Sequence, residues 1–293
     1  MLENTKIIVD LESCTKCKAC VNVCRHFIFE SDNLSFDKEA DEFCIECGKC
    51  VAVCPVNAIK LKIHKDEILE DVPTDEYIPS FKTLSNLFKI RRSRRQFKDK
   101  SVPKELIEKI LNVAGRYSAT GHNEENVYFT IVQDCETLEN LTNEINNQIK
   151  GLVESFEDPQ RKKFLEKSFP SNIIDRFKDI LPTFKRILKR IELGKEIWRW
   201  GAEIIIIHSP KTSMTLKDNC ALAACQIMLA AETLGLGTCS LGFMTNFFST
   251  LRSTRKIVNL PRNHVVGYTL AIGYPKAQYH RIPARKPLKA TWL

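Results

Sequence analysis

Residues 14–24 read CTKCKACVNVC and residues 44–54 read CIECGKCVAVC, so one cysteine spacing occurs twice, displaced by thirty residues. In each copy three cysteines are separated by two residues, and a fourth follows after three more. This spacing is typical of chains that bind two four-iron clusters, because three thiolates hold one cluster while the distant fourth ligates its neighbour. The first predicted ligand set is Cys14, Cys17, Cys20 and Cys54. The second is Cys44, Cys47, Cys50 and Cys24.

Zinc and disulfides are the two alternatives for these cysteines. A zinc ribbon needs two cysteine pairs for each metal ion, and a disulfide framework would indicate a secreted chain. Residues 1–64 resemble a bacterial-type ferredoxin with two [4Fe-4S] clusters, which implies single-electron transfer. The first copy departs from the second at one flanking position, where Arg25 replaces the Pro55 of the second copy. A cation beside Cys24 predicts that the second cluster is the easier one to reduce.

Size and composition indicate a two-domain globular protein. The chain has 293 residues, of which 43% are hydrophobic and 27% charged, with a formal net charge of +8. No signal peptide is evident in residues 1–10, and the longest apolar run, residues 221–231, is too short to cross a bilayer. We therefore expect a cytoplasmic protein without a membrane partner. The basic excess is interpreted as solvated faces and an anion site, so no nucleic-acid partner is expected.

The pattern of apolar residues divides the chain into three parts. Residues 1–64 form the expected cluster domain, with strands over 6–9 and 58–63; residues 65–80 read as a linker, and residues 81–293 form a second domain. In this domain strands are expected over 127–132, 202–208 and 264–273, the second being a buried central strand. Helices are expected after Ser101, which we assign as an N-cap followed by an early helical Pro103, and over 217–234. Residues 135 to about 197 are expected to be helical, with breaks near Pro159, Pro170 and Pro182.

Residues 91–97 read RRSRRQF and place four guanidinium groups and a hydroxyl within seven residues. Arginine matches phosphate oxygens with paired hydrogen bonds, and serine adds another donor. Taken alone, the segment fits a phosphate site, a solvated basic turn or a nucleic-acid patch.

The segment resembles the opening of the nitroreductase family of FMN enzymes, and further resemblances follow in order along the chain. They are residues 119–123 (ATGHN), 235–242 (GLGTCSLG), 273–275 (GYP) and 285–288 (RKPL). The resemblance covers residues 81–293 and implies an α+β fold with a central, mainly antiparallel sheet surrounded by helices. It also implies bound FMN and a homodimer with two flavins at the subunit interface.

The resemblance also assigns residues to FMN. The phosphate and ribityl end would be held by Arg91, Arg92, Ser93, Arg95 and Arg285. The polar edge of the flavin would be held by Asn123, and its ring would be lined by Ser240, Leu241 and Gly242. Two positions depart from the family pattern. Glu125 is either a solvent-facing substitution or a carboxylate near the flavin ring, and Glu203 replaces a proline before the central strand without an evident reason.

The sequence therefore predicts an FMN- and iron-sulfur-dependent reductase in which the flavin performs the chemistry and no side chain is nucleophilic. Its electron donor would be an external ferredoxin or NAD(P)H, and its small-molecule acceptors nitroaromatic, nitroheterocyclic or quinone compounds. One alternative is a flavoprotein that oxidises NAD(P)H and sends electrons outward through the clusters to a protein. The other is a non-catalytic electron carrier.

Overall fold

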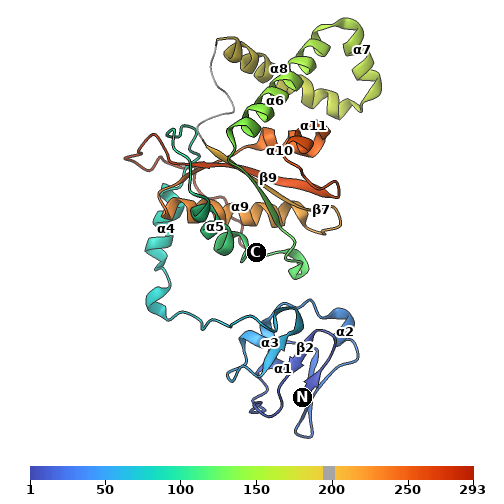
Figure 1. Ribbon diagram of the computed structural model, residues 1–293, viewed down its shortest axis with the longest axis vertical. Coiled ribbons are helices and arrows are strands. Elements are labelled where there is room, and N and C mark those ends of the chain that lie inside the picture. The colour runs from blue at the N-terminus through green and yellow to red at the C-terminus, as the bar shows by residue number, and fades with distance from the viewer. Residues whose placement is uncertain (194–201) are drawn as a thin grey trace. The chain divides into compact units, whose positions relative to one another are not determined.

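The computed structural model describes residues 1–193 and 202–293, which form two compact units. The first unit contains Met1–Pro79 and Thr120–Glu125, and the second contains Ser80–Ala119 and Asn126–Leu293 (Figure 1). Between the last strand of the first unit and Pro79 the chain forms only two 3₁₀ turns, η1 (Lys62–His64) and η2 (Asp75–Tyr77). No helix of the described residues is both long and apolar enough to cross a membrane.

The first unit is a small α+β fold with two antiparallel sheets. Strands β1 (Leu2–Glu3), β2 (Ile7–Val9) and β5 (Ile59–Leu61) form one sheet in the order β1-β2-β5. Strands β3 (Phe27–Glu30) and β4 (Asn33–Phe36) form a hairpin, whose turn residues Ser31 and Asp32 both have positive φ. The helices are α1 (Ala19–Val23), α2 (Ala40–Phe43) and α3 (Lys49–Ala52). The pairing of β2 with β5 confirms both strands expected in this region.

The second unit is built on an antiparallel sheet in the order β6-β7-β9-β8. Its strands are β6 (Tyr128–Val132), β7 (Glu203–Pro210), β8 (Gly237–Ser240) and β9 (His264–Gly273). Seven of the eight β7 residues are buried, which confirms the predicted central strand. The surrounding helices are α4 (Phe81–Ile90), α5 (Lys104–Ile110), α6 (Cys135–Glu157), α7 (Pro159–Ser168), α8 (Ser171–Glu192), α9 (Leu216–Thr233), α10 (Gly242–Thr250) and α11 (Arg252–Ile257). A π-helical turn, η3 (Leu111–Gly115), continues α5, and the α+β prediction is confirmed.

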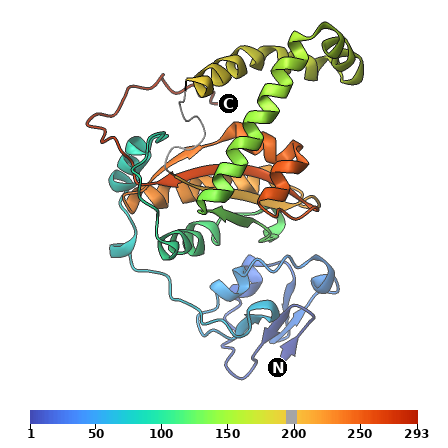
Figure 2. The ribbon, with the colours of Figure 1, turned by 45° about the horizontal axis from the view of Figure 1, so that its top comes forward.

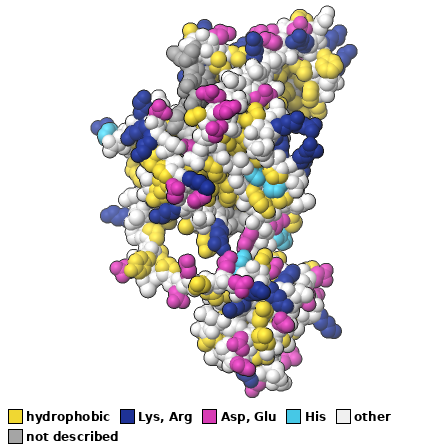
Figure 3. All heavy atoms as spheres, in the orientation of Figure 1, with side chains coloured by type: hydrophobic (Ala, Val, Ile, Leu, Met, Phe, Trp, Pro, Cys, Tyr) yellow, Lys and Arg dark blue, Asp and Glu magenta, His cyan; other side chains and the backbone are white. Residues whose placement is uncertain are grey.

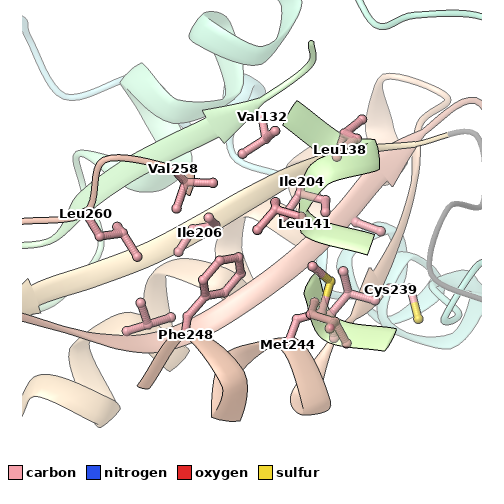
Figure 4. Close-up of a cluster of buried hydrophobic side chains, with 14 of the residues drawn as sticks. Val132, Leu138, Leu141, Ile204, Ile206, Cys239, Met244, Phe248, Val258 and Leu260 are labelled. Carbon is pink, nitrogen blue, oxygen red and sulfur yellow. The ribbon is translucent and has the colours of Figure 1, made fainter. Parts of the chain in front are cut away.

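The isoleucines of β7 separate two apolar layers, because successive side chains of a strand point to opposite faces. Ile204 and Ile206 pack with residues of α6, α8 and α10, as the close-up in Figure 4 shows for Leu141, Met244 and Phe248. The alternate residues Ile205 and Ile207 pack with α5 and α9 on the other face, where Figure 1 shows these helices. The sheet is therefore covered on both sides.

Helices α6, α7 and α8 extend beyond the edge of the sheet (Figure 2). As expected, Pro159 is the first residue of α7 and Pro170 immediately precedes α8. The expected break at Pro182 is wrong, because this residue lies inside α8. Proline there removes one hydrogen bond, yet apolar residues on both sides of it, such as Leu181 and Ile187, pack against the core. The last part of the predicted helical segment, residues 194–197, lies outside the described residues.

The start of α5 also differs from the prediction. Pro103 is the residue preceding the helix and Ser101 makes no side-chain cap. Instead, Glu203 Oε1 accepts hydrogen bonds from Ser101 Oγ at 2.8 Å and from the Val102 amide at 2.6 Å. Glu203 is only 5% exposed, so the carboxylate that replaces the usual proline joins the start of β7 to the turn before α5.

Replacing Glu203 with alanine is expected to lower the free energy of unfolding by about 2 kcal/mol or more, because the buried Val102 amide would lose its acceptor. Glu203→Gln keeps an acceptor oxygen at the same position and should lose less. Thermal unfolding of both variants, followed by circular dichroism, measures the difference. Equal melting temperatures for Glu203→Ala and the wild type would contradict this role of the carboxylate.

Two buried histidines meet between β7 and β9, where His208 Nδ1 and His264 Nδ1 are 2.8 Å apart. His208 Nε2 also lies 3.0 Å from Thr130 Oγ1. Burial lowers the pKa of His208 to about 4, with further contributions from His264 and Arg255. Burial likewise lowers the pKa of His264. The pair is therefore neutral at pH 7.

This pair predicts a loss of stability in mild acid. In the unfolded chain His208 takes up a proton near its ordinary pKa of 6.5, whereas in the fold it stays neutral down to about 4. The unfolded state thus holds more protons in this window, and the free energy of unfolding falls as the pH drops from 6.5 to 4, by about 2 kcal/mol. Melting temperatures across this range measure the effect, which should be weaker in His208→Gln. An identical pH profile for that variant would rule out the histidine as the cause.

Candidate functional site

The two cysteine loops of the first unit have matching backbone conformations. Lys18 and Gly48 precede α1 and α3, and both have left-handed backbone angles, with φ of 64° and 70°. Lys16 and Glu46 are also displaced by thirty residues and also have positive φ. Left-handed angles are disfavoured for residues with a Cβ, so their repetition indicates that both loops are shaped for the same purpose.

The four predicted ligands of the first cluster surround one cavity. Cys14, Cys17, Cys20 and Cys54 all line it, together with apolar residues such as Phe29 and Ile59. Cys54 Sγ accepts a hydrogen bond from the Ala58 amide at 3.3 Å, a contact of the kind that tunes cluster potentials. Four thiols around one cavity are the donor set that a [4Fe-4S] cluster requires, so these residues fit the group.

The predicted ligands of the second cluster also influence one another. The pKa of the Cys50 thiol is raised to about 12, mainly by burial and in smaller part by the nearby Cys24, Cys44 and Cys47 sulfurs. Cys24 is therefore close to the second set although it belongs to the first motif. Bound iron would lower the pKa of these thiols again, because the positive charge of the metal deprotonates a coordinating thiol. Among residues 1–193 and 202–293, no three His, Cys, Asp or Glu side chains are placed to hold a single metal ion.

Lys6 is a residue near this second set that the sequence did not single out. Its Nζ donates a hydrogen bond to the Cys44 carbonyl at 2.7 Å, and its charge favours the Cys44 thiolate. Burial is the larger effect and raises the pKa of that thiol. Lys6 lies eight residues before the first cysteine and is not part of a recognisable motif. Only folding brings it next to the cysteine loop that begins at Cys44.

Charge is unevenly divided along the chain. Acidic residues outnumber basic residues in 1–79, so the whole basic excess belongs to the remainder of the chain. Figure 3 shows acidic side chains over the visible face of the first unit and several groups of Lys and Arg over the second. An anion is therefore more easily accommodated by the second unit.

All five residues predicted for the FMN phosphate line a single cavity of about 700 Å³ in the second unit. They are Arg91, Arg92, Ser93, Arg95 and Arg285. The cavity is closed on its other side by the chain after β9, including Tyr279 and Arg281. Among the residues that the structure describes, no acidic side chain lines it. Guanidinium groups and a hydroxyl around an open space fit a phosphate group well.

The arginine segment is held in place by the sheet. Ser93 bridges to Thr238 of β8, and the Arg94 amide donates to the Thr238 carbonyl at 2.8 Å. A Cβ on Gly237 would lie 2.5 Å from Arg94 Cγ, so only glycine permits this close approach. Arg94 itself is not one of the lining residues, and its Nη2 lies 3.3 Å from Glu232 Oε1. One arginine thus anchors the segment while its neighbours face the cavity.

The three residues predicted for the flavin ring line a second cavity of about 740 Å³. Ser240, Leu241 and Gly242 stand where β8 leads into α10, and Arg95 lines both cavities. The first amides of α10 have no acceptor within the helix, and a Cβ on Gly242 would meet no atom within 4 Å. This turn therefore offers backbone donors beside open space, as a flavin ring would require.

The lining of this second cavity includes residues that the sequence did not single out, among them Tyr268 and Ile187. Tyr268 of β9 lines it, and its hydroxyl lies 2.8 Å from Ser240 Oγ. Ile187 of α8 also lines it, so the long helical segment contributes to the wall. Neither residue belongs to a motif. An apolar residue such as Ile187 in an amphipathic helix indicates that the helix packs against another surface. It does not indicate which surface that is.

Asn123 is the predicted FMN residue that the structure does not place with the others. It belongs to the segment Thr120–Glu125, which groups with the first unit. Its Nδ2 donates to the Glu46 carbonyl at 3.2 Å and to Glu125 Oε1 at 3.1 Å. Glu125 Oε2 also lies 3.9 Å from His64 Nε2, and the carboxylate is largely exposed. The contacts of Glu125 agree with its solvent-facing interpretation.

The sequence profile of the nitroreductase family matches residues 89–274. The chain therefore belongs to the nitroreductase family and is an oxidoreductase. A second profile, that of the 4Fe-4S dicluster domain, matches residues 13–59, and this range contains all eight predicted cluster ligands. The chain thus joins an iron-sulfur domain to a nitroreductase domain.

Individual relatives agree with this architecture. A protein of Archaeoglobus fulgidus, provisionally named an NADH dehydrogenase/NAD(P)H nitroreductase, is 27% identical over 190 residues, or 64% of this chain and 82% of the relative. An uncharacterized ferredoxin of Methanocaldococcus jannaschii is 44% identical over 62 residues, covering 20% of this chain and 40% of that protein. Among solved structures, a nitroreductase with bound FMN from Desulfitobacterium hafniense has a TM-score of 0.50 and 19% identity, over 71% of this chain and 97% of its own. This last likeness shows the shared fold.

Proposed function

We propose that this protein is an FMN-dependent reductase that receives single electrons through two [4Fe-4S] clusters and reduces nitroaromatic, nitroheterocyclic or quinone acceptors. The observation that carries the proposal is the arrangement of the two adjoining cavities. One is lined by all five residues expected at the FMN phosphate, the other by all three expected at the ring, and Arg95 borders both. Similar proteins of the family are described as binding FMN, including that of Desulfitobacterium hafniense.

When bound, FMN would supply two-electron chemistry and the clusters one-electron transfer. The protein's own contribution is binding and orientation. Arg91, Arg92 and Ser93 would hold the phosphate, and the amides at the start of α10 would direct hydrogen bonds at the ring. Apolar residues of the second cavity, such as Phe243 and Met244, would exclude water and accept an aromatic ring.

A homodimer is part of this proposal. Helix α4 is amphipathic, yet none of its residues is buried, and Phe81 and Phe88 are 85% and 55% exposed. Apolar surface of this kind favours association with another chain. We also propose a cytoplasmic location, where cysteines remain reduced for cluster binding.

The alternative direction of electron flow is a second candidate, favoured by the provisional NADH dehydrogenase/NAD(P)H nitroreductase name of the Archaeoglobus fulgidus relative. In this case NAD(P)H would reduce the flavin and the clusters would pass electrons outward. Anaerobic mixing with NADPH or NADH, with optical and EPR detection of the clusters, separates the two directions. Rapid reduction of both clusters by nicotinamide alone supports the outward direction.

The test of the main proposal uses anaerobically purified protein and chemically reduced ferredoxin as donor. We expect about eight iron atoms per chain, bound FMN, and turnover of a nitroaromatic or quinone. Iron and flavin without turnover across a broad panel of acceptors would indicate an electron carrier. Protein that holds zinc in place of iron, or that takes up no flavin, would contradict the proposal.

A further inference from the structure

The arginine-lined cavity carries more positive charge than one phosphate group can neutralise. Five guanidinium groups and one imidazole line it: Arg91, Arg92, Arg95, Arg281, Arg285 and His280. Among the described residues, no carboxylate pairs with any of these six side chains. A flavin phosphate carries at most two negative charges. Most of the positive charge would remain without a counterion after FMN has bound.

The basic groups also differ in depth. Arg91 and Arg92 are partly buried beside β8, whereas Arg281, Arg285 and His280 are exposed on the chain after β9. The inner arginines are those best placed for a group that must be held tightly. Of these outer groups, His280 and Arg281 are not among the residues assigned to the FMN phosphate; with Tyr279 they form the exposed rim of the same 700 Å³ cavity. A second anion can therefore approach the rim without entering the inner part.

An exposed aromatic ring stands beside this rim. Tyr279 lines the cavity, and Arg94 covers one face of its ring at 4.0 Å from the centroid. Arg94 is fixed in turn by Glu232 and by the Ala277 carbonyl, at 3.3 and 3.0 Å. Tyr279 remains 50% exposed, so it offers surface for a further flat group. Aromatic side chains commonly stack on nucleobases.

We propose that the rim formed by Tyr279, His280 and Arg281 is a second binding site, for a nucleoside phosphate, next to the proposed FMN site. The phosphate of this ligand would pair with Arg281, and its base would stack on the exposed part of Tyr279. The inference rests on the proposed function, because the inner arginines are reserved for the FMN phosphate. It adds a nucleotide site to that function.

Isothermal titration of the FMN-saturated holoprotein with ADP tests the site, and inorganic phosphate and adenosine serve as the two partial probes. We expect one equivalent of ADP to bind without releasing FMN, and adenosine to bind at least tenfold more weakly. Higher salt should weaken ADP binding, because the site is basic. Absence of ADP binding, or release of FMN in proportion to added ADP, would overturn the second site.

Two variants separate the parts of the site. Arg281→Gln should weaken both ADP and phosphate at least tenfold, whereas Tyr279→Leu should weaken ADP about threefold or more and leave phosphate unchanged. Arg262→Gln removes an exposed arginine of the turn before β9 and should change neither. Unchanged ADP affinity in Arg281→Gln overturns the assignment. Flavin content is measured separately: protein without FMN contradicts the proposed function, and FMN-loaded protein without ADP binding contradicts only the second site.

Discussion

Replacing Cys24 with alanine is expected to remove the second cluster and leave the first. Cys24 belongs to the first motif in sequence, but in the structure it lies close enough to Cys44 and Cys50 to raise the pKa of both thiols. Iron should fall from about eight to about four atoms per chain, because the second cluster loses one of its four ligands while the first keeps all of its ligands. Iron analysis and EPR spectra of the reduced protein measure the outcome.

The reciprocal variant makes the test specific. Cys54 lines the cavity of the first set, so Cys54→Ala should remove the first cluster and keep the second. Cys225→Ala changes an exposed cysteine of α9 and should keep all the iron. If Cys24→Ala lost the first cluster instead, each motif would hold its own cluster and the crossed ligand sets would be wrong. Retained FMN in all three variants shows that the second unit is still folded.

Local sequence patterns predicted those helices and strands whose conformation follows from their own residues. The isoleucine run of β7 and the short strands β2 and β5 depend mainly on the residues within each element. Tertiary contacts decided the remainder. Ser101 looks like a helix cap, but the carboxylate of Glu203, about one hundred residues later, binds it and leaves the helix to begin at Lys104. Pro182 looks like a helix end, but packing on both sides keeps α8 continuous.

The same distinction applies to the candidate site. The cysteines and the arginines could be predicted from short motifs, because in each case several functional groups lie close together in the sequence. Lys6, Ile187, Tyr268 and Arg281 stand alone in sequence and reach their sites only through folding. Asn123 lies on a segment grouped with the first unit, so its role toward FMN stays a prediction.

Replacing Arg92 with alanine should raise the dissociation constant of FMN about 10- to 100-fold, since a hydrogen bond to a charged group contributes about 1.5–3 kcal/mol. Arg92 is partly buried in the cavity lining and is paired with no carboxylate among the described residues, so its charge is available to the phosphate. The fluorescence of FMN released during dilution measures the affinity. Riboflavin, which lacks the phosphate, should bind the variant and the wild type equally.

Arg262→Ala is the matched control, because it removes an exposed arginine that does not line the cavity. Arg94→Ala is the informative contrast. Arg94 anchors the segment through Glu232 and does not line the arginine-lined cavity of about 700 Å³, so its loss should lower the melting temperature as well as FMN affinity. Arg92→Ala should lower affinity alone, and iron content should stay near eight atoms per chain. Undiminished FMN affinity in Arg92→Ala would place the phosphate outside this cavity, and the reductase would need a different flavin site.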